Sequence, residues 1–176
     1  SEYKMWLWAW PGVTSAYDIR YATSPDGIDW TDGGHALGVG PEAWDSATVI
    51  EPAVIYRDGL YEMFYGGTGL GGSEIGYATS VDGAVWTKYD HDLDPGAPVL
   101  RREPGFDSAS VSSPTVLLDG STYEMWYRAS DGTTRLGYAT SELGPVAVND
   151  PPVFDPIADV EVDEDAGEIA IVVANR

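Results

Sequence analysis

The sequence predicts an all-β fold, because short motifs recur along the chain, aromatic residues and glycine are abundant, and a helical apolar period is missing. Among its 176 residues are 21 Gly, 11 Tyr and 7 Trp. Aromatic residues separated by glycine turns are typical of many short strands. No stretch of ten or more residues shows the apolar spacing of a helix.

The recurring motifs return at intervals of about 60 residues, which is the size of a four-stranded unit rather than of a helical repeat. The sequence Tyr-Ala-Thr-Ser occurs at 21–24, 77–80 and 138–141. Other related segments are YKMW (3–6), YEMFY (61–65) and YEMWY (123–127), then Trp44-Asp45-Ser46 and Phe106-Asp107-Ser108.

Each unit is interpreted as four antiparallel strands. In the complete unit the strands are expected at 52–56, 60–65, 74–79 and 85–88. Asp58-Gly59 between the first two strands predicts a tight hairpin turn. A Ser-x-Asp-Gly-x-x-Trp element occurs at 24–30 and 80–86. Its Asp is expected to bond the turn backbone, and its Trp to fill the gap between neighbouring sheets.

The units are too few for a closed ring of sheets. The chain starts at a second strand, 3–10, and the third unit is expected to end after its third strand. Even a small β-propeller has about four blades of four strands. We therefore expect a partial β-propeller of about two and a half to three blades, completed by a longer parent chain or by oligomerisation.

The composition changes after Gly144, which divides the chain into blade repeats at 1–144 and a linker with a tail strand at 145–176. The tail, from Val153 to Gly167, resembles the start of a cadherin-like bacterial surface repeat. That resemblance implies a secreted or cell-surface protein. The alternative is that residues 169–174 form one more strand of the last blade.

The charge and cysteine content exclude several classes of function. The net charge of −20 argues against partners such as nucleic acid or an anionic membrane surface, both of which recruit Lys and Arg. Without cysteine, the chain has no disulfide, zinc–thiolate site or thiol nucleophile. No apolar run approaches the roughly 20 residues of a membrane-spanning helix.

Residues 3–144 resemble the five-bladed propellers of glycoside hydrolase families 43 and 32. The resemblance rests on segments 50–55, 60–65 and 75–80, with Asp82-Gly83 and Trp86. It implies a carbohydrate partner and a general acid supplied by a Glu before Pro, a position that Glu51 matches. The Asp-Pro step that would supply the base is not identified, so it stays open whether the chain is an enzyme. The alternative is a non-catalytic glycan-binding, adhesive or structural repeat.

Five further residues are candidate ligand contacts. Trp6, Trp8 and Trp10 alternate onto one strand face, which could stack on sugars or pack against a neighbouring blade. Asp45 and Asp107 recur before inner strands, either as turn residues or as funnel carboxylates.

No metal site or cofactor is expected, and Ca²⁺ at the alternating aspartates 90, 92 and 94 is the one open alternative. His35 and His91 are expected to be surface residues, because neither has a companion at metal-site spacing.

Overall fold

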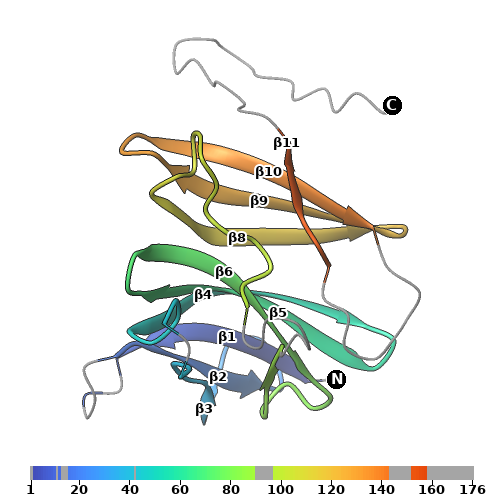
Figure 1. The fold of residues 1–176 in the computed structure, drawn as a ribbon. Coiled ribbons are helices and arrows are strands. Elements are labelled where there is room, and N and C mark those ends of the chain that lie inside the picture. The colour runs from blue at the N-terminus through green and yellow to red at the C-terminus, as the bar shows by residue number, and fades with distance from the viewer. Residues whose placement is uncertain are drawn as a thin grey trace, which may run out of the picture.

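A computed structural model describes residues 2–10, 12, 16–41, 43–89, 97–142 and 152–157. Throughout these residues the secondary structure is β-strand, turn and bend, so the predicted all-β class is confirmed. The strands form three antiparallel sheets stacked one above another, with the first at the bottom and the third at the top of Figure 1. This arrangement agrees with a partial propeller. None of the described residues forms a helix that could cross a membrane.

The three sheets follow the chain in order. The first contains β1 (Tyr3–Ala9), β2 (Asp18–Ser24) and β3 (Thr31–Leu37). The second contains β4 (Thr48–Arg57), β5 (Leu60–Gly69), β6 (Gly72–Ser80) and β7 (Thr87–Lys88). The third contains β8 (Ser110–Asp119), β9 (Thr122–Ser130), β10 (Thr134–Glu142) and β11 (Asp155–Ile157).

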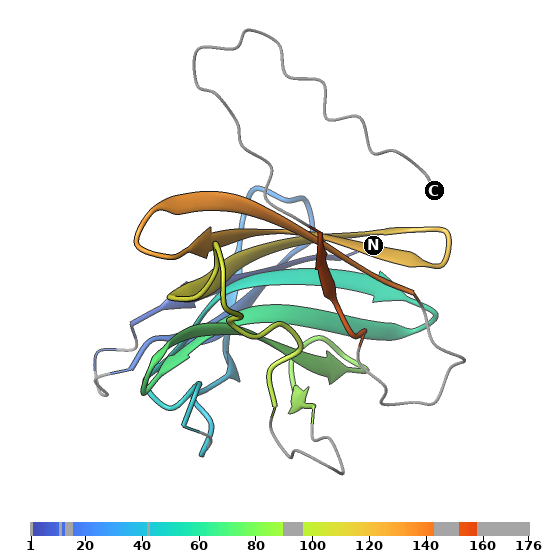
Figure 2. The same cartoon turned by 45° about the horizontal axis from the view of Figure 1, so that its top comes forward.

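The third sheet has a fourth strand, so the expectation that this unit ends after three strands is wrong. Strand β11 pairs antiparallel with β10, and Thr140 lies opposite Asp155. In Figures 1 and 2 β11 is the dark red strand, drawn at a slant to β10. Residues 158–176, with most of the cadherin-like segment and the alternative strand 169–174, lie outside the described residues.

The inner strands β4 and β8 each contain a bulge at an X-Pro step. Strand β4 begins at Thr48 rather than at Pro52, and Glu51 and Pro52 together lie opposite the single residue Tyr65. Ser113 and Pro114 make the same irregularity in β8. A bulge leaves a residue out of the ladder, so Pro is tolerated there and the strand continues through it. The expected start at Pro52 was wrong for this reason.

Side chains alternate across β5 and supply both hydrophobic clusters. Met63 is buried with Ile19 and Trp86 between the first and second sheets. Phe64, the next residue, is buried with Tyr123 between the second and third sheets. The alternation of a strand therefore makes the second sheet the centre of the core.

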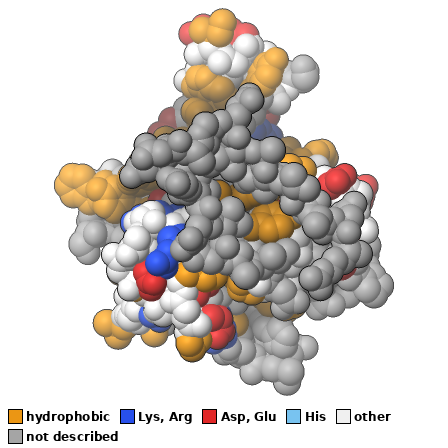
Figure 3. All heavy atoms as spheres, turned by 90° about the horizontal axis from the view of Figure 1, so that it is seen from above, with side chains coloured by type: hydrophobic (Ala, Val, Ile, Leu, Met, Phe, Trp, Pro, Cys, Tyr) orange, Lys and Arg blue, Asp and Glu red, His pale blue; other side chains and the backbone are white. Residues whose placement is uncertain are grey.

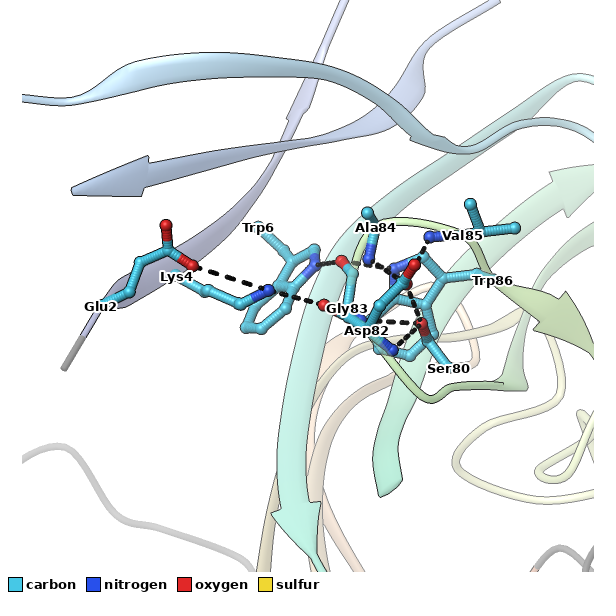
Figure 4. A network of polar contacts seen from close by, with 9 residues as sticks. All are labelled: Glu2, Lys4, Trp6, Ser80, Asp82, Gly83, Ala84, Val85 and Trp86. Carbon is cyan, nitrogen blue, oxygen red and sulfur yellow. Dashed lines mark hydrogen bonds and ion pairs between the residues drawn. The ribbon is translucent and has the colours of Figure 1, made fainter. Parts of the chain in front are cut away.

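The turn from Ser80 to Trp86 fastens the second sheet to the first (Figure 4). Asp82 Oδ1 accepts hydrogen bonds from the backbone N–H groups of Ala84 and Val85, at 2.8 and 2.9 Å. Trp86 is 8% exposed, and its ring lies 5.9 Å from that of Trp6 in an edge-on arrangement. The expected roles of Asp82 in the turn and of Trp86 between sheets are thus both confirmed.

Candidate functional site

Glu51 is held in a conformation that its local sequence disfavours. Its φ is +56°, in the left-handed region that a residue with a side chain rarely adopts. The following proline disfavours helical backbone at this position and makes extended backbone the preferred alternative. Strain of this kind persists only where surrounding structure imposes it, and it clusters at functional sites. The bulge therefore marks Glu51 as a candidate site residue.

The carboxylate of Glu51 bridges the second and third sheets. Its Oε2 accepts a hydrogen bond of 2.8 Å from the backbone N–H of Ser113. Ser113 occupies the matching bulge in β8 and shares the left-handed backbone, with a φ of +52°. Glu51 stays partly exposed, and within the described part of the chain its Oε1 accepts no hydrogen bond. One carboxylate oxygen thus anchors the side chain to the third sheet, and ligand contact by Glu51 stays a prediction.

Exposed aromatic rings lie on the first sheet near the start of β4. Trp8 is 48% exposed and packs edge-on against Tyr17, with ring centroids 5.2 Å apart. The Tyr17 carbonyl accepts a hydrogen bond of 3.2 Å from the N–H of Val49, two residues before Glu51. Trp10, at the end of the same strand face, is 61% exposed. The aromatic stripe therefore continues toward the segment that carries Glu51.

Trp6 differs from the other two tryptophans of its stripe. It packs against Tyr61 and Trp86 of the second sheet, and its Nε1 donates a hydrogen bond of 2.8 Å to the Gly83 carbonyl (Figure 4). This is the blade-packing alternative of the sequence analysis. Ligand contact by the stripe stays a prediction, and Trp8 and Trp10 are the members with exposed rings.

Asp45 is 1% exposed and forms an ion pair with Lys88 of β7. Burial lowers the pKa of Lys88, and the Asp45 carboxylate opposes that shift. The Tyr65 hydroxyl donates to the same carboxylate at 3.4 Å, and burial raises the pKa of Tyr65 well above its usual value. These contacts lie within the second sheet, which favours the turn interpretation of Asp45.

Asp107 is the counterpart of Asp45 in the third sheet but lacks a lysine partner. Pro156 lies opposite Ala139 of β10, the position that Lys88 takes opposite Ala78 of β6. Asp107 is 2% exposed, and its Oδ1 accepts a hydrogen bond of 3.3 Å from the Glu103 N–H. Burial raises the pKa of Asp107. For both aspartates, burial favours the turn role, and ligand contact stays a prediction.

The two aspartates are expected to respond differently to conversion to Asn. Asp45→Asn removes the charged partner of Lys88 and should lower the free energy of unfolding at pH 7 by about 1.5–3 kcal/mol. Asp107→Asn should be milder, because burial already disfavours its charged form. Urea unfolding of both variants and the parent measures the difference.

The pH dependence supplies the control. A raised folded-state pKa means that the folded protein holds the Asp107 proton more tightly than the unfolded chain. The stability from this proton is present below the ordinary value of 3.8 and disappears as pH rises through the folded pKa. The free energy of unfolding of Asp107→Asn, relative to that of the parent, should therefore be higher at pH 7 than near pH 4. An unchanged difference would contradict the assigned role of burial.

The structure also bears on the predictions about metal sites. Among described residues there is no group of three or more His, Asp or Glu side chains placed to hold a metal ion. Asp90, Asp92, Asp94 and His91 lie outside the described residues, so Ca²⁺ at that loop stays a prediction. His35 is exposed, and its Nε2 lies 3.8 Å from an Asp18 carboxylate oxygen.

Two residues near these sites were missed by the sequence analysis. Tyr17 lies in the connection from β1 to β2, where no periodicity marked it, and its neighbourhood depends on tertiary packing. Lys88 could have been singled out as one of only 9 basic residues beside 29 acidic ones. A rare cation inside an expected strand is a signal for a buried partner.

Comparison with known proteins finds relatives that extend beyond this chain. No protein-family model matches it. An uncharacterized protein of Mycobacterium tuberculosis is 36% identical over 107 residues, which is 57% of this chain and 33% of that protein. A second strain of the bacterium has a protein with the same match. The chain thus spans about a third of the length of the relatives it matches.

Several solved structures with a similar backbone are of carbohydrate-acting proteins. The GH32 β-fructofuranosidase of Bombyx mori superposes with a TM-score of 0.64 and 19% identity, over 80% of this chain and 30% of that one. The family 117 glycoside hydrolase of Zobellia galactanivorans gives 0.62 and 18%, over 80% and 41%. The β-1,2-mannobiose phosphorylase of Listeria innocua gives 0.62 and 16%, over 87% and 39%. At these identities the likeness concerns the backbone, and this chain has the fold of part of a glycoside hydrolase propeller.

Proposed function

We propose that this chain is a carbohydrate-active, glycoside hydrolase-like propeller module whose poly- or oligosaccharide ligand contacts Glu51. The observation that carries the proposal is the left-handed backbone of Glu51 at an inner-strand bulge. Ser113 shares this backbone, so the feature that distinguishes Glu51 is a partly exposed carboxylate at the bulge. The carbohydrate-acting proteins of the same fold support the choice of ligand.

The aromatic side chains near β4 suit a sugar. Binding sites combine apolar and aromatic walls with a few placed polar groups. Trp8, Trp10 and Tyr17 offer exposed rings, at 48%, 61% and 40%. Glu51 would accept hydrogen bonds from sugar hydroxyls through Oε1 while its Oε2 stays bound to Ser113.

Catalysis would use Glu51 as the general acid that protonates the leaving oxygen. Inverting hydrolysis also needs a base carboxylate about 6.5–9.5 Å away to activate water. Within the described residues the matching bulge offers Ser113, and Asp45 and Asp107 are buried. We therefore assign none of these three residues as the base.

The second candidate is a non-catalytic glycan-binding or adhesive module. It is favoured by the exposure of Trp8 and Trp10, which need no carboxylate pair to hold a sugar. In either case we propose a secreted or cell-surface protein of bacterial type.

The test measures binding and hydrolysis on the same variants. Calorimetry and product analysis would use β-1,2-mannobiose, sucrose and a panel of soluble polysaccharides. We expect Trp8→Ala to weaken binding about tenfold or more, as the loss of about 1.4 kcal/mol implies. Tyr56→Ala, an exposed aromatic of β4 on the far side of the bulge from Val49, is the control and should bind like the parent.

The outcomes for Glu51→Gln separate the two functions. Binding without hydrolysis in the variant, beside hydrolysis in the parent, would identify the acid. Equal binding and no hydrolysis in either protein would identify a binding module. Hydrolysis that survives Glu51→Gln excludes Glu51 as the acid, and no binding to any sugar by the parent overturns the proposal.

A further inference from the structure

Both contacts between sheets are built in the same way. The second sheet inserts two aromatic rings into the first, and the third sheet inserts two into the second. In both cases one ring comes from the start of the inserting sheet's second strand and the other from the residue before its fourth strand. At the first contact Tyr61 and Trp86 meet Trp6, at centroid distances of 5.6 and 5.9 Å. At the second contact Tyr123 and Phe154 meet Phe64, at 5.9 and 5.7 Å. The matching residues on the receiving strands are Trp6 of β1 and Phe64 of β5.

The first sheet carries the same inserting pair without a recipient in the described chain. Tyr3 matches Tyr61, and Trp30 precedes β3 as Trp86 precedes β7. Tyr3 and Trp30 are 54% and 38% exposed, whereas Trp86 is 8% exposed. Met5 shares the face of Tyr3 and is 38% exposed, whereas its counterpart Met63 is fully buried.

This inserting pair already has the geometry that it would use. Trp30 Nε1 donates to the Gly27 carbonyl at 3.2 Å, as Trp86 Nε1 donates to the Gly83 carbonyl at 3.1 Å. The Tyr3 ring lies beside Gly27, as the Tyr61 ring lies beside Gly83. A preformed arrangement reduces the entropy that docking must overcome.

The outer face of the third sheet carries the receiving residues. On β9, Tyr123 and Met125 are buried toward the second sheet, so Glu124 and Trp126 face the other way and are partly exposed. Trp126 matches Trp6 and Phe64 and packs against Tyr138 at 5.2 Å. Apolar neighbours on this face are Leu117 and Leu136, at 47% and 40% exposure. Figure 3 looks onto this side of the molecule, where hydrophobic side chains are visible.

We propose that the inserting pair of one copy, Tyr3 and Trp30, docks on Glu124 and Trp126 of a second copy. Glu62 is the counterpart of Glu124 at the contact between the second and third sheets. There it accepts a hydrogen bond of 2.7 Å from the Tyr123 hydroxyl of the next sheet. Glu124 would accept from Tyr3 in the same way. The two surfaces differ and lie on opposite sides of the stack, so the association is head-to-tail.

A second copy is the occupant because this one chain carries both halves of the contact. The inserting Tyr and Trp, the glycine beneath them and a receiving Trp are used at its first contact, and a receiving Glu is used at its second. Each copy carries a net charge of −20, so repulsion opposes the association and added salt should strengthen it.

The test is light scattering coupled to size exclusion, over a range of protein and NaCl concentrations. We expect the parent to associate, more so at high salt, and Trp30→Ala and Trp126→Ala to be monomers when studied alone. An equimolar mixture of the two variants should form a dimer and nothing larger, because only one complementary pair of surfaces survives. Leu70→Ala, which removes an exposed side chain from the β5–β6 turn, should associate like the parent.

Circular dichroism and urea unfolding of each monomeric variant establish that it is folded. Trp30→Glu, which introduces a like charge at the docking surface, should also be monomeric. A parent that stays monomeric at every concentration and salt overturns the proposal. Association of Trp30→Ala and Trp126→Ala to the same extent as the parent would also overturn it. An equimolar mixture of the two variants that remains monomeric would do the same.

Discussion

Replacement of Glu62 by Ala is expected to lower the free energy of unfolding by about 3–5 kcal/mol, as removal of one partner of a buried ion pair does. Glu62 is 2% exposed and accepts four hydrogen bonds. Two come from the Arg57 guanidinium, each of 3.2 Å. The others come from the hydroxyls of Tyr77 and Tyr123, at 2.6 and 2.7 Å.

The size of this effect follows from what the substitution leaves behind. The two tyrosine hydroxyls would lose their acceptor in a buried position, and the Arg57 charge would keep only the exposed Asp58 carboxylate, 3.9 Å away, as a counterion. The nearby carboxylate raises the pKa of Arg57, and burial raises the pKa of both tyrosines. Because Tyr123 belongs to the third sheet, the loss also loosens the contact between the second and third sheets.

Urea unfolding of three variants would test this. Glu62→Gln keeps an acceptor but loses the charge, so it should lose about 1–3 kcal/mol. Glu142→Ala is the control, because Glu142 also accepts from two hydroxyls, those of Ser121 and Thr122, but is exposed. It should change stability by no more than about 0.5 kcal/mol. Equal losses in the free energy of unfolding for Glu62→Ala and Glu142→Ala would contradict the claim that burial of Glu62 sets the size of its effect.

The sequence predicted the features that depend on local pattern. Strand alternation and the Asp58-Gly59 turn required only neighbouring residues, and both are present, with Asp58 and Gly59 at positive φ of 51° and 86°. The Asp82 turn and the position of Trp86 between sheets followed from a motif that occurs twice. Local hydrogen bonds and period-two burial are determined within a few residues, and for this reason a sequence reveals them.

Features that depend on distant partners could not be predicted in this way. Glu62 belongs to a recognised repeat motif, but its burial depends on Tyr123, 61 residues away along the chain. Glu51 was singled out because it precedes a proline, as the resemblance to glycoside hydrolase propellers implies for the general acid. Its left-handed backbone and its bond to Ser113 come from the register shift between β4 and β5, which composition does not encode. The bulge is therefore the reason that the backbone conformation and the hydrogen bond of Glu51 could not be predicted from the sequence.

The fourth strand of the third sheet was missed for another reason. The segment around Pro152 and Pro156 has the composition of a linker, and the sequence immediately before it lacks the Ser-x-Asp-Gly-x-x-Trp motif. Phe154 nevertheless precedes β11 as Trp86 precedes β7. The remaining signal for a strand was an aromatic residue one position before it. The prolines on either side of Phe154 favoured a linker instead.

Phe154→Ala is accordingly expected to lower the free energy of unfolding by about 3–5 kcal/mol, as truncation of a buried Phe does. Phe154 is 5% exposed and packs against Phe64 and Tyr123, with centroids 5.7 and 6.4 Å away. Its neighbour Val153 is 73% exposed, so Val153→Ala is a matched control with little expected effect. Urea unfolding followed by tryptophan fluorescence would compare the two variants.

The result for Phe154 decides how the third sheet is completed. Three residues of β11 alone provide few backbone hydrogen bonds, and the ring of Phe154 adds packing against Phe64 of β5 and Tyr123 of β9. A large loss with Phe154→Ala and none with Val153→Ala would mean that the segment is part of the folded unit and that the second sheet depends on it through Phe64. A loss no greater than that of Val153→Ala would mean that the core between the second and third sheets is stable without the ring of Phe154.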